Sequence, residues 1–483
     1  MKNKTIKNSI FNFIKTIATF LFPMITFSYI SRVFLADGIG RINFAKSFIG
    51  IFSMIAMLGI RFYGIRECAK RRDDKDELSK TFSQLLVFNF ISLLLAYIVL
   101  IVFVFFSKKT KGYITEIELY SVTMLISVIS IEWLYIALED YKYLAFRSIF
   151  IQAITLGAVF LFVRNKEDIY MYIVIQVLSS FVINALGLIH ARKYVHFIPP
   201  KIGDVAVHLR PVLALFVVMM FIQIFTDINT VMLGYLANDT QVGLYSSAYK
   251  MSGVICSFIS AITTVIMPRI AYEIENEDEA TANRLLKHAI QFLLLVGIPL
   301  SVGTCIYSKN FILILSGEGF VKATPLSMVL SLRSFLSPIN GMLLTHYLIQ
   351  RNKDKEAIII TATAAGFNII MNALTIPHLG AMGTSLSTVC AEVVEMIFIF
   401  IFVRKYLDIR EVFSKGYQYL LCVLPVIVVA IGAKIFINNI VISVLVGAAI
   451  GGCIYFLLLY LIKNEYFLMG IELVKNMRKR DVA

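Results

Sequence analysis

The chain has 483 residues, of which 59% are hydrophobic and only 16% are charged, with a net charge of +14 and a mean hydropathy of +0.81. A soluble protein cannot bury that much apolar surface, so the composition excludes a soluble domain and predicts an all-α polytopic membrane protein. The positive charge would suggest nucleic-acid binding in a soluble chain. Here most of it lies in loops between apolar spans, so we expect membrane lipids and no nucleic acid as partners.

Apolar stretches separated by short polar loops predict about 14 transmembrane helices, each long enough to cross a bilayer core of roughly 30 Å. The glycine-containing residues 36–40 predict a tight turn after the first of them. In chain order, the predicted spans cover residues 9–35, 43–65, 81–106, 117–138, 146–163, 169–191, 211–236, 242–268, 285–307, 325–349, 357–376, 381–403, 417–437 and 440–462.

An internal repeat relates the two halves of the chain. When the sequence is shifted by 203 residues, Gly40 aligns with Gly243 and Arg66 aligns with Arg269. A parallel duplication of a helical bundle is one of the two standard plans of transporters. We therefore predict two pseudo-symmetric six-helix lobes followed by two C-terminal helices. The predicted domains are an N-terminal lobe (1–210), a C-terminal lobe (211–410), and the last two helices with a basic cytoplasmic tail (411–483).

Lysine and arginine residues gather in alternate loops. The loop at residues 66–80 and its counterpart after Arg269 are rich in cations, whereas three turns on the opposite side contain none. Because cationic loops stay in the cytoplasm, we expect both termini and these two loops to be cytoplasmic.

Six charged residues inside the predicted spans form the candidate site. A charge in the hydrocarbon region is costly, so it should face a wet cavity or a partner. An excess of positive charge favours an anionic substrate, and Lys and Arg bind phosphate or pyrophosphate through charge-assisted hydrogen bonds. Asp227 is the main acid in this set, and no acid is evident in the sequence beside Lys46 or Arg333. The predicted substrate-binding residues are Lys15, Arg32, Lys46, Asp227, Lys250 and Arg333.

Some of these residues also admit a structural interpretation. Asp227 and Lys250 lie at nearly the same depth and would also suit an ion pair within a helical hairpin, while Arg32 is near enough to a helix end to reach the interface. Glu392 and Glu395 are interpreted either as a polar seam between helices or as a coupling-ion site, so proton or sodium coupling stays open. We predict no other cofactor, no catalytic residue and no metal site, because the motifs and cysteine spacings for them are missing.

Four stretches resemble the O-antigen and capsular polysaccharide repeat-unit flippases (Wzx-type) of the multidrug/oligosaccharidyl-lipid/polysaccharide exporter superfamily. They are YISR with GIGRINFA in residues 29–45, EWLY with EDYKY and Arg147 in 132–147, LSGEGFVKA in 315–323, and NALTIPHLGAMG with Glu392 in 368–392.

The resemblance implies two six-helix bundles that move an undecaprenyl-pyrophosphate-linked oligosaccharide to the outer leaflet by alternating access through a cationic cavity, without covalent chemistry. It further implies a bacterial cytoplasmic (inner) membrane and other polysaccharide-assembly membrane proteins as partners.

Other functions remain open at this point. Within the same superfamily, the alternatives are a peptidoglycan lipid precursor flippase and a cation-coupled multidrug exporter, although an exporter of cationic drugs should carry more acids in its spans. A membrane polysaccharide polymerase would need a large outer loop rich in Arg and His, which the chain lacks. An acyltransferase would need a histidine placed within the membrane, for which His346 is the nearest candidate.

Overall fold

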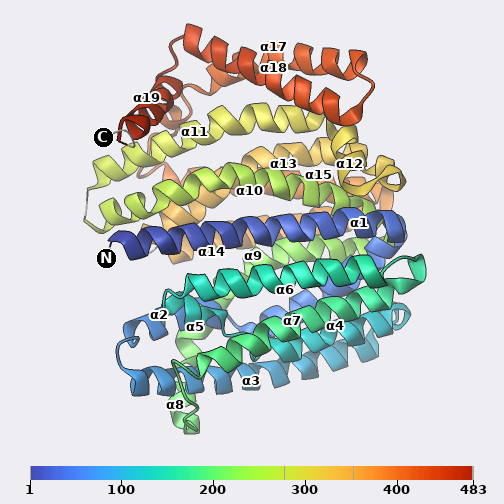
Figure 1. The fold of residues 1–483 in the computed structure, drawn as a ribbon, viewed down its shortest axis with the longest axis vertical. Helices are drawn as coiled ribbons and strands as arrows, with labels where there is room; N and C mark the ends of the chain where they lie inside the picture. The colour runs from blue at the N-terminus through green and yellow to red at the C-terminus, as the bar shows by residue number, and fades with distance from the viewer. Residues whose placement is uncertain (1, 277, 352, 481–483) are drawn as a thin grey trace. The chain divides into compact units, whose positions relative to one another are not determined.

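The computed structural model describes residues 2–276, 278–351 and 353–480, and every described element is helical (Figure 1). Two compact units make up the chain, Met1–Ser246 and Ser247–Ala483. The first contains α1 (Lys2–Met57), α2 (Ile60–Lys70), α3 (Lys75–Phe106), η1 (Lys109–Tyr113), α4 (Ile114–Ser127), α5 (Glu132–Ala137), α6 (Tyr141–Phe162), η2 (Lys166–Asp168), α7 (Ile169–Ala191), α8 (Ile202–Ala206), α9 (Leu209–Leu236) and the start of α10 (Asp239–Glu275). The second contains the rest of α10 and α11 (Glu279–Ile306), α12 (Ser308–Ser316), η3 (Glu318–Ala323), α13 (Thr324–Leu343), η4 (Leu344–Leu348), η5 (Ile349–Arg351), α14 (Asp354–Leu379), α15 (Ala381–Val403), α16 (Ile409–Val412), α17 (Gly416–Phe436), α18 (Ile440–Leu461) and α19 (Glu465–Arg480).

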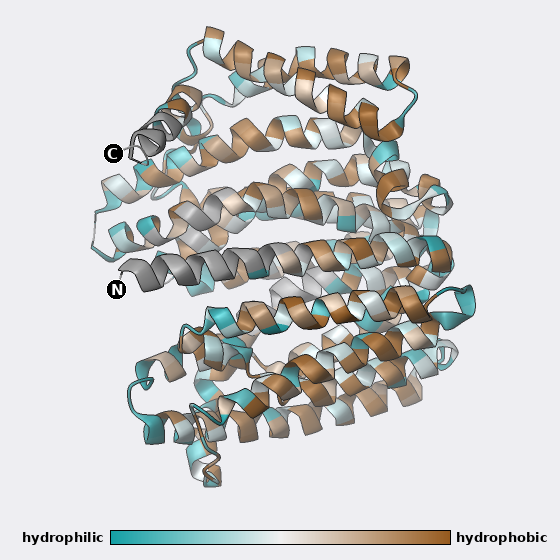
Figure 2. Cartoon of the chain, in the orientation of Figure 1, coloured by the Kyte–Doolittle hydropathy of each residue, from teal (hydrophilic) through white to brown (hydrophobic). Residues whose placement is uncertain are grey.

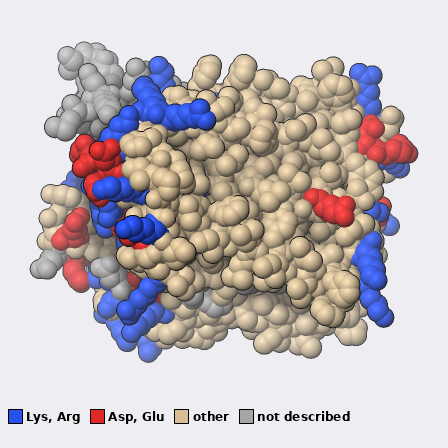
Figure 3. Space-filling model, turned by 90° about the horizontal axis from the view of Figure 1, so that it is seen from below, with Lys and Arg blue, Asp and Glu red and all other residues tan. Residues whose placement is uncertain are grey.

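Hydrophobic and charged residues are distributed along the helices as in a membrane protein. Ten helical segments of the described residues are long and apolar enough to cross a bilayer. Hydrophobic residues dominate the middle of the helices and hydrophilic residues gather at the loops (Figure 2), and on one face the charged residues lie mainly at the two ends (Figure 3). The all-α polytopic membrane class is therefore confirmed. The count of about 14 spans and the domain boundaries after residues 210 and 410 stay predictions.

A buried tryptophan, Trp133, lies in the hydrophobic core of the first unit. Trp133 on α5 is 3% exposed and packs with Phe82 of α3. Gly64 of α2 lies so close to the indole that an added Cβ would be 2.7 Å from one of its ring carbons. The absence of a side chain at residue 64 therefore allows α2 to pack directly on α5.

Buried tyrosines attach the last two long helices to the second unit. Tyr419 of α17 donates to the side chain of Gln291 on α11 at 3.1 Å, and Tyr455 of α18 donates to the carbonyl of Leu295 at 2.9 Å. Both hydroxyl groups pair with acceptors on α11; α17 packs against α11, and α18 packs against α17.

The predicted turn at residues 36–40 is wrong. The chain bends at a single residue, Leu35, with φ of 56° and ψ of −171°, and residues 36–57 continue as the second part of α1. A non-glycine residue in this left-handed region is strained, which marks the position as a sharp bend held by its surroundings. Gly40 is helical, so its missing side chain serves packing rather than a turn.

Gly40 and Gly243 make a reciprocal contact. A Cβ added to Gly40 would lie 1.8 Å from the carbonyl oxygen of Asp239, and one added to Gly243 would lie 1.8 Å from that of Ala36. Residues 36 and 239 are related by the same 203-residue shift as residues 40 and 243. The start of α10 and the second part of α1 therefore approach each other backbone to backbone in a symmetric manner, which only glycine permits.

Polar contacts also stabilise the region around Gly40 and Gly243. Tyr113 of η1 donates to Asp239 at 2.5 Å, and Arg41 pairs with Glu116 of α4 at the same distance. Glu116 is only 1% exposed. The short η1 segment and α4 are thereby fixed to the two segments that carry the reciprocal glycines.

The predicted span at 117–138 is interrupted. The structure ends α4 at Ser127 and begins α5 at Glu132. Asn89 of α3 donates its side-chain amide to the carbonyl of Ser127 at 3.2 Å, beside the backbone N–H of Ser130, which donates to the same carbonyl at 3.1 Å. The interruption places Glu132 at the first position of a new helix.

Candidate functional site: charged residues within the helices

Lys15 has an acidic partner that the sequence did not reveal. Its ammonium forms an ion pair with the carboxylate of Glu132, on α5. The side chains are 18% and 30% exposed, so water screens this pair only in part. After the interruption between α4 and α5, Glu132 stands at the start of α5, from where its side chain reaches Lys15 of α1.

Arg147 of α6 lies near this pair and was missed as a site residue. It is 6% exposed, its guanidinium lies 5.8 Å from the ring centre of Tyr135 and 5.5 Å from that of Tyr143, and it attracts Glu132 electrostatically. A Cβ on Gly187 would lie 2.3 Å from one of its nitrogens, so a glycine on α7 makes room for the cation. The sequence signal was the position of Arg147 beside the EDYKY motif.

Lys46 and Asp227 are brought together on α1 and α9. Lys46 is exposed although it lies in the middle of a span, and Asp227 is the acid that acts on it electrostatically. Gly50, one turn after Lys46, provides the space for that acid: an added Cβ would lie 3.0 Å from Asp227 Oδ2. The expectation that Lys46 has no acid beside it is therefore wrong, because its partner lies in the other half of the repeat.

Arg32 and Lys250 are two further predicted cations. Arg32 donates to the carbonyl of Ser28 at 2.5 Å and to its hydroxyl at 2.7 Å, so the guanidinium turns back along its own helix. Lys250 is half-buried on α10. Asp227 belongs to the first unit and Lys250 to the second, and a pairing between these two residues stays a prediction. The same holds for the substrate-binding role of all six candidates.

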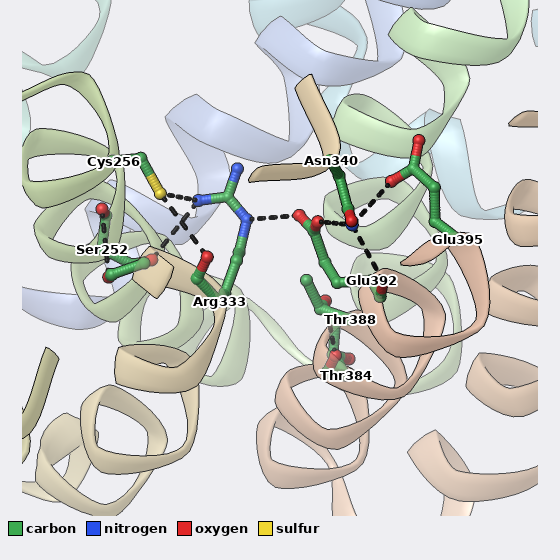
Figure 4. Close-up of polar contacts among 9 residues, drawn as sticks. Ser252, Cys256, Arg333, Asn340, Thr384, Thr388, Glu392 and Glu395 are labelled. Carbon is green, nitrogen blue, oxygen red and sulfur yellow. Dashed lines mark hydrogen bonds and ion pairs between the residues drawn. The ribbon is translucent and has the colours of Figure 1, made fainter. Parts of the chain in front are cut away.

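Arg333 belongs to a buried cluster on α10, α13 and α15 (Figure 4). Its Nε lies 3.4 Å from Glu392 Oε1, and its Nη1 donates to Ser252 Oγ at 3.3 Å and to Cys256 Sγ at 3.6 Å. The guanidinium carbon lies 4.3 Å from the ring centre of Tyr249. Here too an acid stands beside a cation that seemed unaccompanied in the sequence.

Asn340 joins two carboxyl groups in the same cluster. Its amide nitrogen donates to Glu392 Oε2 at 3.0 Å and to Glu395 Oε2 at 3.4 Å, and also to the backbone carbonyl of Glu392 at 2.9 Å. Figure 4 shows Asn340 between the two carboxylates, with Thr384 and Thr388 on the same helix as Glu392. The interpretation of Glu392 and Glu395 as a polar seam between helices therefore has a structural basis.

The described residues contain no group of three or more His, Cys, Asp or Glu that could hold a metal ion. The side chain of His346, the candidate for an acyltransferase, lies outside the described residues. The geometry is thus one of paired charges inside apolar helices, which can bind and release an ionic group.

The fold is similar to that of solved membrane transporters. Over 93% of this chain and 98% of the other, the structure is similar to that of the lipid II flippase MurJ in an inward closed conformation, with a TM-score of 0.68 and 16% identity. It is also similar to an inward-facing multidrug resistance MATE family transporter of the MOP superfamily, with a TM-score of 0.60 and 15% identity over 80% of this chain and 93% of the other. At these identities the likeness concerns the fold.

The chain belongs to the polysaccharide biosynthesis protein family (Polysacc_synt), whose model matches residues 5–272. It is 22% identical over 383 residues to a protein of Escherichia coli (strain K12) named "Putative O-antigen transporter". The aligned residues cover 77% of this chain and 91% of that protein. The predicted resemblance to polysaccharide flippases of this superfamily is thereby confirmed.

Proposed function

We propose that this protein is a flippase that moves an undecaprenyl-pyrophosphate-linked oligosaccharide repeat unit from the cytoplasmic to the outer leaflet of a bacterial cytoplasmic membrane. The observation that carries this proposal is a flippase-like fold in a polysaccharide biosynthesis family member whose spans hold charged side chains. Charged groups inside the hydrocarbon region are costly, so such groups are usually functional. In a flippase, they would bind the polar headgroup as it crosses the membrane.

The ion pairs suggest how such a headgroup is held. Lys15, Lys46 and Arg333 each have a carboxylate partner in the structure. A pyrophosphate group that enters between the partners replaces a carboxylate with another anion, so the cations stay compensated throughout the cycle. Alternating access then exposes the site first to one leaflet and then to the other. We propose proton or sodium coupling as the energy source.

Deletion of the gene tests this function. The expected result is accumulation of lipid-linked repeat units on the cytoplasmic side and loss of surface polysaccharide, because a sugar headgroup does not cross the hydrocarbon core unaided. Lipid extracts of the deletion strain, of the complemented strain and of the parent provide the measurement. Unchanged lipid-linked sugars together with normal surface polysaccharide contradict the proposal, and accumulation of the peptidoglycan precursor instead assigns the protein to that alternative.

Cysteine labelling tests the proposed orientation, with both termini in the cytoplasm. Asp74 and Asp278 accept hydrogen bonds from the first turns of α3 and α11, so replacing them would cost about 1 kcal/mol each. Asp73 and Glu275 are exposed neighbours without that role. In a cysteine-free background, Asp73→Cys and Glu275→Cys are expected to react with an impermeant maleimide only after the cells are opened. Labelling of either residue in intact cells contradicts the orientation.

A further inference from the structure

We propose that the connector between α7 and α9, residues 192–210, lies on the membrane surface and binds the anionic headgroups of phospholipids. Its exposed apolar side chains enter the edge of the hydrocarbon layer, and its cations contact the lipid phosphates. This inference concerns the first unit alone. It does not depend on the flippase function proposed above.

Two serines of α3 determine the level of the connector along the helices. Ser79 Oγ accepts a hydrogen bond from the backbone N–H of His196 at 3.1 Å, and Ser83 Oγ accepts one from the backbone N–H of Ile198 at 2.9 Å. Both serines are completely buried. Ser83 lies in the first turn of the predicted span 81–106. The connector therefore runs beside α3 where the polar start of that helix gives way to its apolar part, which is the level of the headgroup boundary.

One face of α8 is fixed to the first unit. Val205 is buried in the hydrophobic core that also contains Trp133. Just after α8, the ring nitrogens of His208 lie 2.9 Å from the hydroxyl of Tyr63 and 2.8 Å from Gln84 Oε1. In Figure 1, α8 lies at the lower edge of the first unit, on the outer side of α3, with which it is in contact. The opposite face of α8 is therefore turned away from the other helices of the unit.

The face of the connector that is turned outward is apolar. Ile202 is 87% exposed, Val207 is 72% exposed and Phe197 is 55% exposed. Large apolar side chains gain free energy when they leave water. At the level of Ser83, the hydrocarbon layer begins beside them. Entry into this layer covers all three side chains without any change in the fold of the unit.

The connector also carries an excess of positive charge. Among residues 192–210, all of which the structure describes, the exposed charged residues are four cations, Arg192, Lys193, Lys201 and Arg210, and one acid, Asp204. The acid accepts a hydrogen bond from the backbone N–H of Lys201 at 3.3 Å. Exposed apolar side chains flanked by lysine and arginine are typical of segments that lie in the interface of anionic membranes.

The neighbouring start of α3 does not cancel this charge. Residues 71–80 contain four basic and four acidic side chains, so their net charge is zero. Asp76, the acid nearest to the connector, lies 3.9 Å from Nε2 of His196 and contacts none of the four cations. The positive excess of the connector is therefore available to an anionic surface, and the phosphates of a lipid leaflet provide one at this level.

Tryptophan fluorescence in lipid nanodiscs tests the depth of the connector. Trp133 is the only tryptophan of the chain and is 3% exposed, so Ile202→Trp adds a second signal at an exposed position. We expect brominated phospholipids to quench this added fluorescence and aqueous acrylamide to quench it only weakly. Asp73→Trp is the matched control, because Asp73 is exposed just before α3 and should respond mainly to acrylamide. An added signal that behaves like that of Asp73→Trp overturns the proposal. Protection from both quenchers overturns it too, because a protein would then cover this face.

Tracer lipids test the preference for anionic headgroups. Spin-labelled phosphatidylglycerol should quench the added tryptophan of Ile202→Trp more strongly than spin-labelled phosphatidylcholine, and salt should reduce the difference. Adding Lys201→Gln should weaken this preference by about fivefold. Lys166→Gln is the control, because Lys166 is an exposed lysine before the opposite end of α7. Equal quenching by the two tracers, or an unchanged preference in the Lys201→Gln protein, refutes the binding of anionic headgroups.

Discussion

Replacing Gly40 or Gly243 with alanine is expected to abolish transport and strongly lower the amount of folded protein. The new methyl group would lie 1.8 Å from a backbone oxygen, whereas real Cβ contacts essentially never fall below 3.0 Å, so the two backbones must separate by more than 1 Å. Backbone atoms cannot rotate away as a long side chain can. Overpacking of this kind costs about 1–3 kcal/mol or more. Membrane abundance and thermal unfolding of the purified variants provide the measurement.

Gly157 and Gly452 are matched controls for this prediction. Both lie within long helices, α6 and α18, and a Cβ on either would meet nothing within 4 Å. Their alanine variants should be as stable as the wild type or slightly more stable, because alanine is the better helix former by about 1 kcal/mol. Normal stability of Gly40→Ala would mean that the reciprocal contact is not needed for the fold.

Lys46→Gln is expected to leave the folded protein abundant but to reduce transport by roughly 10- to 100-fold, which is the loss of one charged hydrogen bond to a phosphate group. Its exposed side chain contributes little to the core, so folding should not depend on it. Lys46→Arg should retain part of the activity, since it keeps the charge but changes the geometry. Surface polysaccharide and membrane abundance are measured side by side.

The double variant Lys46→Gln/Asp227→Asn separates a substrate role from architecture. If the two residues only neutralise each other, removing both charges should restore transport, whereas a cation that binds the headgroup cannot be replaced in this way. We expect no recovery. Lys142→Gln is the control, because Lys142 is an exposed lysine near the start of α6. Full transport by the double variant would assign the pair to structure.

Hydrophobic patterning was sufficient for the class of fold, because a long apolar helix is a local property of the sequence. The bend at Leu35 could not be predicted in the same way. Glycines 38 and 40 suggested a turn, but in the structure they allow neighbouring residues to pack closely. At the interruption before Glu132, the carbonyl of Ser127 accepts a hydrogen bond from Asn89, a residue of another helix. Such breaks arise from tertiary contacts that periodicity does not contain.

The sequence identified the individual charged residues within the spans, but it did not identify most of their oppositely charged partners. Lys15 and Glu132 are 117 residues apart, and Arg333 meets Glu392 across two different helices. The positions of Lys15, Lys46 and Arg333 inside apolar spans were evident, because a charge is conspicuous there. Their pairing depends on how the helices pack, and a single sequence gives no direct signal of it. The second acid of the Asn340 cluster was visible only as the spacing of Glu392 and Glu395.

The reciprocal glycine contact also bears on the history of the chain. When residue 40 meets 239 and residue 243 meets 36, the two segments are related as identical chains are across a two-fold axis. If the two halves arose by duplication, the same surface would have fitted a second copy of itself before the genes were joined. Both positions are therefore restricted to glycine, because each one accommodates a backbone carbonyl of the opposite segment.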